Sequence, residues 1–222
     1  MKIFMKVFSV VFLLAISIAT EAQRQLGEGS LEYNISISSN KSSSPIANSL
    51  NGATLTVYLK EGKSRTEMNS SLGSEITVFD NRAQDGFILK EYSGQKLMIS
   101  MTSANWADKN KLYDNLNFQV SNELVTIGDY NCKKAVASMP DGKTFTVYFH
   151  PAISLVNKNY NNAFPQLPGL PVQFELQSGD LSFKYSLNKI SYENVSAAKF
   201  AAPKSGFRIM TYQENQQLKK NR

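Results

Sequence analysis

An alternation of apolar and polar residues with a period of two runs through most of this chain and constrains its fold more than any other feature. Every second position is apolar in six segments, at 31–37, 55–59, 97–101, 145–149, 172–176 and 181–187. This pattern is typical of strands that bury one face and leave the other in water. The sequence therefore predicts a mainly β protein, with a strand content well above the usual figure of about 20–25% of residues.

Glycine-containing turns separate the alternating segments. They are Glu61-Gly62, Ser93-Gly94, Asp141-Gly142 and Ser178-Gly179-Asp180. Such short connections join antiparallel neighbours, because a parallel crossover needs about a dozen residues or more. The count of segments predicts about eleven strands in up-and-down order, and an open sheet of that size has to curl. We therefore expect a barrel or a half-open barrel.

Three longer stretches interrupt this meander, at 38–52, 102–122 and 151–170. The first is rich in Ser and Asn and is expected to be a surface loop. In the second, Ser103 can cap a helix, and Trp106, Leu112 and Leu116 recur near helical spacing. The third begins with residues 152–156, which we expect to form one or two helical turns. Long connections in compact domains are often lids or binding elements.

The N-terminus has the organisation of a secretory signal peptide. Lys2 and Lys6 precede an apolar run at 7–19, and Thr20-Glu21-Ala22 offers small residues for cleavage. We expect cleavage after Ala22 and export to the periplasm or beyond, without a cysteine for lipid attachment and without a membrane span. The remainder is expected to form a single domain at 23–212, followed by a polar, frayed tail at 213–222.

The charge balance is mildly basic. The 24 basic and 18 acidic residues of the chain fall to 22 and 17 when residues 1–22 are removed, a formal charge of +5. The basic residues are scattered along the chain, without the stripe of cations and aromatic residues that favours nucleic-acid binding. Nucleic acid is therefore not an expected partner.

The chain has a single cysteine and a single histidine. Cys132 begins a strand-like segment, which favours a buried thiol, although Lys133 and Lys134 could activate it if it were exposed. One His and one Cys cannot supply the usual zinc ligand sets, and the chain contains neither a calcium-loop motif nor a Gly-x-Ser-x-Gly elbow. A Cys132–His150 pair is the remaining nucleophilic candidate. We expect neither a metal nor a cofactor.

Carboxylates offer a second route to catalysis. A glycosidase-like pair could be formed among Glu67, Glu75, Asp80 and Asp85, although nothing in the sequence singles out two of them. Acidic residues at strand edges are usually solvated. A hydrolase is therefore the third of three functional hypotheses for this chain.

The segment "FPQLPGLPVQFEL" at 164–176 carries three prolines at a spacing of three and then continues as a strand. The prolines stiffen the backbone and would hold Leu167 and Leu170 in place, while Gly169 permits a sharp turn or a close backbone approach. Two interpretations are open. The leucines could face a ligand at the mouth of the curled sheet, or the segment could seal the core and block unwanted strand pairing.

Several stretches of the chain also resemble known families. "LPGLP" followed by a strand is similar to the motif of exported bacterial proteins of the GLPGLI type. Three further stretches resemble a related exported family grouped with the lipoprotein carrier LolA: "IGDYNCKKAV" (127–136), "GKTFTVYFHPAI" (142–153) and "FAAPKSGFRIMT" (200–211). The resemblance covers most of residues 127–211, and the N-terminal half matches in strand rhythm alone.

The resemblance implies a LolA-like fold, a curled antiparallel sheet of about eleven strands with short helices or loops across its open side. It also implies a hydrophobic cavity for an acyl chain or a similar apolar ligand, but not lipoprotein transport. On this basis we expect the cavity and its lid to be formed by Trp106, Val147, Phe149, Leu167, Leu170, Phe174 and Tyr185.

The leading hypothesis is accordingly an exported, non-enzymatic protein that binds a lipid or another apolar small molecule. The alternative is a structural module of the envelope that binds a protein partner without a small ligand, using exposed strand edges or the proline segment.

Overall fold

The computed structural model describes residues 23–39, 45–114, 116–140, 142–161 and 163–220. The expected signal peptide at 1–22 lies outside the described residues. About half of the described residues belong to strands, which confirms the prediction of a mainly β protein.

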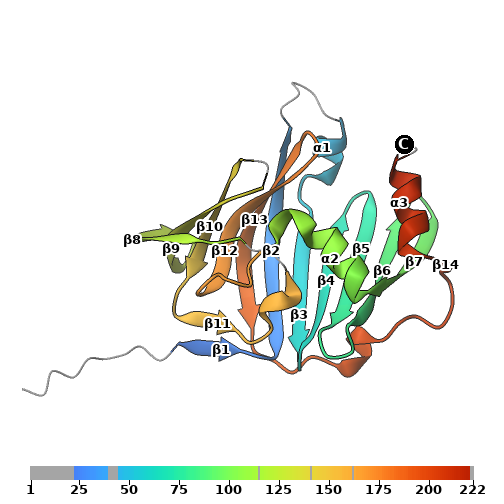
Figure 1. Ribbon diagram of the computed structural model, residues 1–222, viewed down its shortest axis with the longest axis horizontal. Helices are drawn as coiled ribbons and strands as arrows, with labels where there is room; N and C mark the ends of the chain where they lie inside the picture. Colours follow the sequence, from blue (N-terminus) through green and yellow to red (C-terminus); the bar gives the residue numbers. More distant parts are fainter. Residues whose placement is uncertain (1–22, 40–44, 115, 141, 162, 221–222) are drawn as a thin grey trace, which may run out of the picture.

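Twelve strands of the described residues form one curled, open sheet, in the order β14-β7-β6-β5-β4-β3-β2-β13-β12-β10-β9-β8 (Figure 1). The bounds are β2 Gly29–Ser39, β3 Thr54–Lys60, β4 Lys63–Ser70, β5 Gly73–Asp80, β6 Asp85–Tyr92, β7 Gln95–Thr102, β8 Gln119–Ile127, β9 Tyr130–Ser138, β10 Thr144–His150, β12 Leu170–Ser178, β13 Leu181–Ser191 and β14 Arg208–Met210. The expected half-open, antiparallel architecture is confirmed.

The strand order differs from a simple up-and-down meander. Strands β2 to β7 follow one another, but the chain then crosses the sheet through 103–118 and continues at the opposite edge with β8. Pairing of β13 with β2 joins the two runs, and β14 pairs parallel to β7. The crossing segment carries its own helix, which is why turn spacing alone did not reveal it.

Within the described residues, three α-helices and three short 3-10 helices accompany the sheet. They are α1 Pro45–Leu50, α2 Ser103–Asn110, α3 Tyr212–Lys220, η1 Lys111–Tyr113, η2 Lys158–Tyr160 and η3 Ala197–Phe200. The helix expected after position 102 is α2, but its cap is Thr102 and not Ser103. The Thr102 side chain accepts from the Asn105 N–H, and the Asn105 side chain accepts from the Thr102 N–H, a reciprocal capping box.

Two local expectations were wrong. The segment expected to start with helical turns forms strand β11 (Ile153–Leu155), which pairs parallel with β1 (Arg24–Leu26) and buries Ile153 and Leu155. The expected frayed tail is helical as far as Lys220. Tyr212, the first residue of helix α3, and Asn215 within the tail are both buried, so packing orders the start of this polar helix.

One region of the sheet, the packed half, consists of β8, β9, β10, β12, β13, β2 and β3. Its inner face buries a continuous apolar core beneath residues 151–169, which we call the proline cover. In register, Val147 lies opposite Phe174, and Phe174 lies opposite Tyr185. All three side chains are buried, as are Phe145 and Phe149, which confirms the predicted inward register.

The other region, the cleft half, consists of β4 to β7, β14, α2 and α3. Here residues 192–207, which we call the strap, cross the outer face between β13 and β14. The strap packs Val195 and Phe200 onto Val78, Phe87 and Leu89. A separate small cluster on the inner face joins Ile88, Ile99, Met101, Met210 and Tyr212.

Polar contacts fasten the strap to the sheet. Glu28 Oε1 accepts hydrogen bonds from Lys60 Nζ (2.7 Å) and from the Val195 N–H (2.8 Å). These two bonds lower the pKa of the Glu28 carboxyl. Arg65 donates to the Lys199 carbonyl (2.7 Å), and the Lys199 ammonium lies 4.1 Å from the centre of the Tyr58 ring. The strap is therefore fastened at Val195 and at Lys199.

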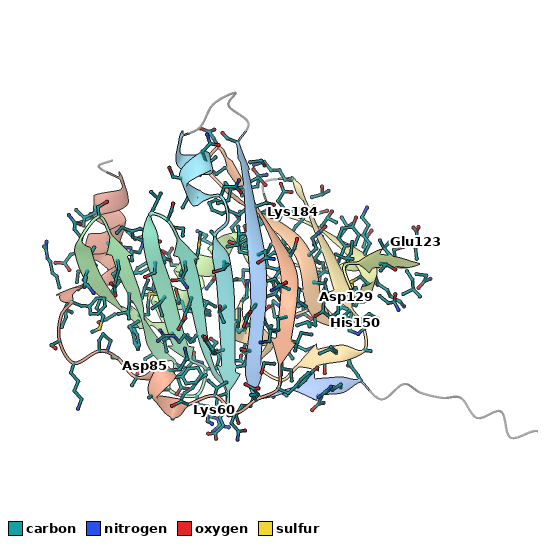
Figure 2. All side chains as sticks on the ribbon, turned by 180° about the vertical axis from the view of Figure 1, so that it is seen from behind. Lys60, Asp85, Glu123, Asp129, His150 and Lys184 are labelled. Atoms are coloured by element: carbon teal, nitrogen blue, oxygen red, sulfur yellow. The ribbon has the colours of Figure 1, made fainter. Side chains whose placement is uncertain are left out.

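The outer face of the packed half has no such cover among the described segments and is polar. Figure 2 shows Lys184 on this face and Glu123 at the β8 edge of the sheet. None of the helices in the described residues is long and apolar enough to cross a membrane.

Candidate functional site

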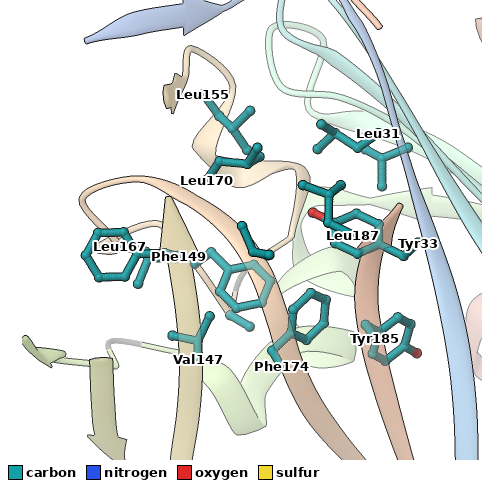
Figure 3. Packing of buried hydrophobic residues seen from close by; sticks show 14 of the residues in the cluster. Leu31, Tyr33, Val147, Phe149, Leu155, Leu167, Leu170, Phe174, Tyr185 and Leu187 are labelled. Atoms are coloured by element: carbon teal, nitrogen blue, oxygen red, sulfur yellow. The ribbon is translucent and has the colours of Figure 1, made fainter. Parts of the chain in front are cut away.

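Six of the seven predicted cavity residues lie together, but they fill the space that we expected a ligand to occupy. Val147, Phe149, Phe174 and Tyr185 point from the inner face of the packed half toward the proline cover (Figure 3). Their exposed fractions do not exceed 9%. These residues form the core of the domain, and a ligand could reach them only if the cover opened.

The proline cover explains why this core is closed. Leu167 and Leu170 are 2% and 0% exposed, so neither leucine lines an open cavity. Phe164 packs edge-on against Phe174, with ring centres 4.7 Å apart. A cavity beside the cover has a volume of about 10 Å³, about the minimum that holds one water molecule. These contacts favour the interpretation of the segment as a seal.

The glycine and the last proline of the segment are fixed by their neighbours. A side chain at Gly169 would meet the His150 carbonyl at 2.5 Å and the Phe149 ring at 2.6 Å, so the cover can approach β10 this closely because it has no Cβ there. The Tyr33 hydroxyl donates to the Pro171 carbonyl at 2.8 Å. The chain therefore enters β12 at one defined register.

Trp106 does not join the other predicted residues. It projects from α2 and stacks on Phe79 of β5, with ring centres 4.5 Å apart and planes 11° from parallel. The same helix is tied to α3, because the Tyr212 hydroxyl donates to Asp108 at 3.0 Å. Trp106 thus belongs to the cleft half.

A cleft of about 360 Å³ opens between the β6–β7 hairpin and α3. Apolar groups are supplied by Leu97 and Leu218, and polar groups by Lys90, Tyr92, Gln95 and Asn215. Its volume falls within the range of about 300–1,000 Å³ typical of small-molecule pockets. The lining is amphipathic, as an amphiphilic ligand would require.

Helix α3 forms the wall of this cleft opposite the hairpin, and hydrogen bonds anchor its first turn. Glu214 accepts from the Thr211 N–H (2.6 Å) and hydroxyl (2.9 Å), while the Glu214 N–H donates to the Thr211 hydroxyl (3.2 Å). Tyr212 accepts from Gln216 at 2.6 Å. The far end of the helix carries Leu218, which is 47% exposed at the cleft. The helix is thus fixed at its base and presents an apolar side chain near its tip.

The floor of the cleft contains an ion pair. Lys90 on β6 and Glu75 on β5 are partners in the sheet register, and their charged atoms are 3.0 Å apart. Burial, and then the Glu75 charge, raise the pKa of Tyr92 to about 12. Burial, followed by the charges of Tyr113 and Glu75, raises the pKa of Tyr185 to about 12. Glu75 therefore acts electrostatically on both the cleft and the packed half.

The nucleophilic candidates do not form a catalytic pair. Cys132 is fully buried, its thiol donates to the Tyr130 carbonyl (3.5 Å), and burial raises its pKa to about 11. This confirms the buried interpretation of Cys132, since such a thiol is a poor nucleophile at neutral pH. The His150 ring instead contacts the Asn131 carbonyl at 2.8 Å.

Three of the four candidate carboxylates, Glu67, Glu75 and Asp80, are paired with basic side chains. Glu67 pairs with Arg65, and Asp80 pairs with Lys63 at 3.5 Å. Asp85 lies opposite Asp80 in the β5–β6 register. Among the described residues, no three His, Cys, Asp or Glu side chains gather as they would around a metal ion. The cleft at α3 remains as a candidate site, because it combines a ligand-sized volume with apolar and polar walls.

The sequence contained a weak signal of this cleft. In β6, Phe87 and Leu89 face outward, while Ile88 and Lys90 face inward, so this strand is apolar on both sides. A strand that is apolar on both sides is covered on both sides, and a lysine at an inward position then needs a partner. Neither feature identified α3, whose sequence is polar.

Comparisons with known proteins identify no family: no protein-family model and no curated protein sequence matches this chain. Solved structures that resemble it include PNGF-II (12% identity, TM-score 0.46, 86% of this chain and 33% of that one) and the Mycobacterium tuberculosis lipoprotein LppX (11%, 0.37, 77% and 90%). MucB is a third (9%, 0.37, 83% and 60%). The chain spans about a third of the length of PNGF-II. At these scores the likenesses bear on neither family nor function.

Proposed function

We propose that this chain is a non-enzymatic binding protein that takes a small amphiphile into the cleft between the β6–β7 hairpin and α3. The observation that carries the proposal is the cleft itself, with a volume of about 360 Å³ and both apolar and hydrogen-bonding walls. Leu97 and Leu218 would contact the apolar part of the ligand. Tyr92, Gln95 and Asn215 would contact its polar part.

The packed half is a poorer ligand site than the sequence led us to expect. Lifting the cover would expose Leu167, Leu170 and Phe164, whose side chains are now at most 3% exposed. Exposing one buried Leu or Phe side chain costs about 1.5–3 kcal/mol, which a small ligand would have to offset before it gained any affinity. The proposal therefore keeps the expected ligand class and moves the site.

Export and family membership are part of the same proposal. The signal-like N-terminus at 1–22 and the resemblance of 127–211 to GLPGLI-type and LolA-related exported proteins support a periplasmic or secreted location. Mass spectrometry of the protein from the exported fraction should find Gln23, or a residue within a few positions of it, at the N-terminus. A full-length chain confined to the cytoplasm would contradict export.

Fluorescence of the neutral apolar probe N-phenyl-1-naphthylamine tests the ligand site. We expect saturable binding, weakened at least fivefold by Leu218→Asp because a carboxylate would enter the apolar wall. Leu124→Asp is the matched control, since Leu124 is 64% exposed on β8, at the opposite edge of the sheet. No saturable binding, or equal effects of the two substitutions, would refute the proposed site.

One observation favours a second candidate, the protein-binding module. Strand β8 is a long edge strand on which Val120 and Leu124 are 40% and 64% exposed. Such an edge can accept a strand from a partner. A bulge and the Glu123 N–H bonded to Ser121 blunt part of this edge. A partner recovered from the exported fraction by the wild type but not by Leu124→Asp would support this candidate, and equal recovery would contradict it.

A further inference from the structure

The cleft floor continues a row of inward-facing side chains across the sheet. The register aligns Met68, Glu75, Lys90 and Leu97 on β4, β5, β6 and β7. The two apolar members flank the two charged ones. Lys90 and Glu75 are partly withdrawn from water, with side-chain exposures of 17% and 30%. The ion pair is therefore built into the wall that a ligand would contact.

The charges around the cleft are already compensated. Lys90 is the one charged side chain among the described residues that line it, and Glu75 neutralises it at 3.0 Å. At the base of α3, the charge of Arg208 acts on the Glu214 carboxylate, which is also bonded to Thr211. An anionic head group would lie beside both the Lys90 ammonium and the Glu75 carboxylate. It would lose hydration without gaining a free counter-charge.

Uncharged polar groups would be accommodated better. Tyr92 offers a hydroxyl, and Gln95 and Asn215 offer amides that both donate and accept. A hydroxyl or amide head group could exchange its water contacts for these partners at little electrostatic penalty. The chemistry of the wall thus differs from that of a fatty-acid site, where an unpaired Lys or Arg would receive the carboxylate.

We infer that the cleft selects amphiphiles with uncharged, hydrogen-bonding head groups, and that Glu75 determines this specificity by holding Lys90. The inference rests on the proposed function and names its ligand class. Glu75 is not itself a lining residue. It acts through Lys90, so its removal should change which head group is preferred without removing the apolar contacts.

Two probes with the same acyl chain test the inference. We would measure displacement of N-phenyl-1-naphthylamine at pH 8 by monolaurin, which has a neutral glycerol head, and by laurate, which is ionised. The wild type should prefer monolaurin by at least tenfold. Glu75→Gln should improve laurate binding about tenfold, because Lys90 loses its partner, and should leave monolaurin within twofold.

Matched variants separate this effect from a change in folding or in overall charge. Glu91→Gln removes a carboxylate from the more exposed Lys96–Glu91 pair on the opposite face of the same hairpin and should alter neither affinity. Glu75→Gln combined with Lys90→Met removes both charges and should abolish the gain for laurate while monolaurin still binds. If the gain persists in the double variant, Lys90 is not its source, and the inference is overturned.

The possible results also distinguish this inference from the proposed function. Binding of both lipids with a laurate preference in the wild type, or with a ratio unaffected by Glu75→Gln, overturns the head-group inference and leaves the ligand site intact. Failure of the fluorescent probe and of both lipids to bind overturns both.

Discussion

In the packed half, the sheet buries one face in a single large apolar cluster, whereas in the cleft half it buries both faces in two small ones. The proline cover closes the inner face of the packed half. In the cleft half the strap covers the outer face, and α2 and α3 reach part of the inner face. The cleft lies where that inner cover is incomplete.

The difference shows that strands with the same alternating pattern can exclude a ligand in one region of the sheet and leave room for one in another. Where every apolar side chain shares one face, the cover can meet it continuously and exclude a ligand. Where the apolar residues divide between faces, each cluster is smaller and polar groups such as Lys90 and Glu75 remain on the inner wall. Binding capacity is thus expected in the less completely packed region of the sheet.

The largest effect is expected from Leu167→Ala combined with Leu170→Ala. Truncating one buried leucine costs about 2–5 kcal/mol, so we expect the double variant to lose at least about 4 kcal/mol of unfolding free energy. Urea denaturation would measure the loss. The only cysteine in the sequence, Cys132, lies in the same core and should become accessible to thiol reagents.

The control for this experiment is Leu218→Ala, which should change stability by less than about 0.5 kcal/mol because Leu218 is half exposed. If the double variant unfolds like this control, the cover does not support the core. The contrast between the two halves would then be lost.

A smaller and more local effect is expected from Phe200→Ala in the strap. Its ring packs on the outer face with Val78, Phe87 and Leu89, and its removal should cost about 3 kcal/mol. Two natural probes distinguish the halves, because the only tryptophan, Trp106, lies in the cleft half and the only cysteine lies in the packed half.

If the halves differ in local stability, Phe200→Ala should shift Trp106 fluorescence at denaturant concentrations where Cys132 is still protected. Parallel changes of the two probes would mean that the sheet unfolds as one unit. The comparison between the halves would then describe packing alone and not independent stability.

Much of the fold could be predicted from the alternating pattern, because burial on one face of a strand leaves a direct trace in the sequence. The inward register of Val147, Phe174 and Tyr185 follows from it and is confirmed. The same pattern cannot show how a long connection crosses a sheet. The path of 103–118 was therefore missed.

The candidate site was harder to predict because its polar residues come from elements whose sequences give little indication of their contacts. The sequence of α3 is polar, yet Tyr212 and Asn215 are buried against the sheet. The proline segment looked like a lid because stiffness and leucines are common to lids and seals. What distinguishes the two is the space beneath, which depends on Phe164 and Phe174 meeting across the cover.

The smallest effect that we predict concerns alkaline pH. Burial raises the pKa values of Tyr33, Tyr160 and Tyr185 in the packed half, that of Tyr185 to about 12. The unfolded chain releases these protons near pH 10, while the folded chain keeps them. Their contribution to stability is thus complete below about pH 10 and decreases as pH rises above 10, for Tyr185 until its folded pKa of about 12 is reached. For Tyr185 alone, linkage predicts a loss of about 1 kcal/mol at pH 11.

Urea midpoints at pH 9 and pH 11, followed by far-ultraviolet circular dichroism, measure this loss. Tyr185→Phe should make the loss of stability between pH 9 and pH 11 smaller by about 1 kcal/mol, because a phenylalanine has no proton to release. The sharper comparison is with Tyr92, whose pKa is also raised to about 12 but whose side chain is only partly buried at the cleft. The two pKa values imply similar losses, and water in the cleft can solvate a Tyr92 phenolate, so Tyr92→Phe should protect no more than Tyr185→Phe. Stronger protection by Tyr92→Phe would show that the cleft excludes water more fully than the packed core, and an open ligand site at α3 would then be untenable.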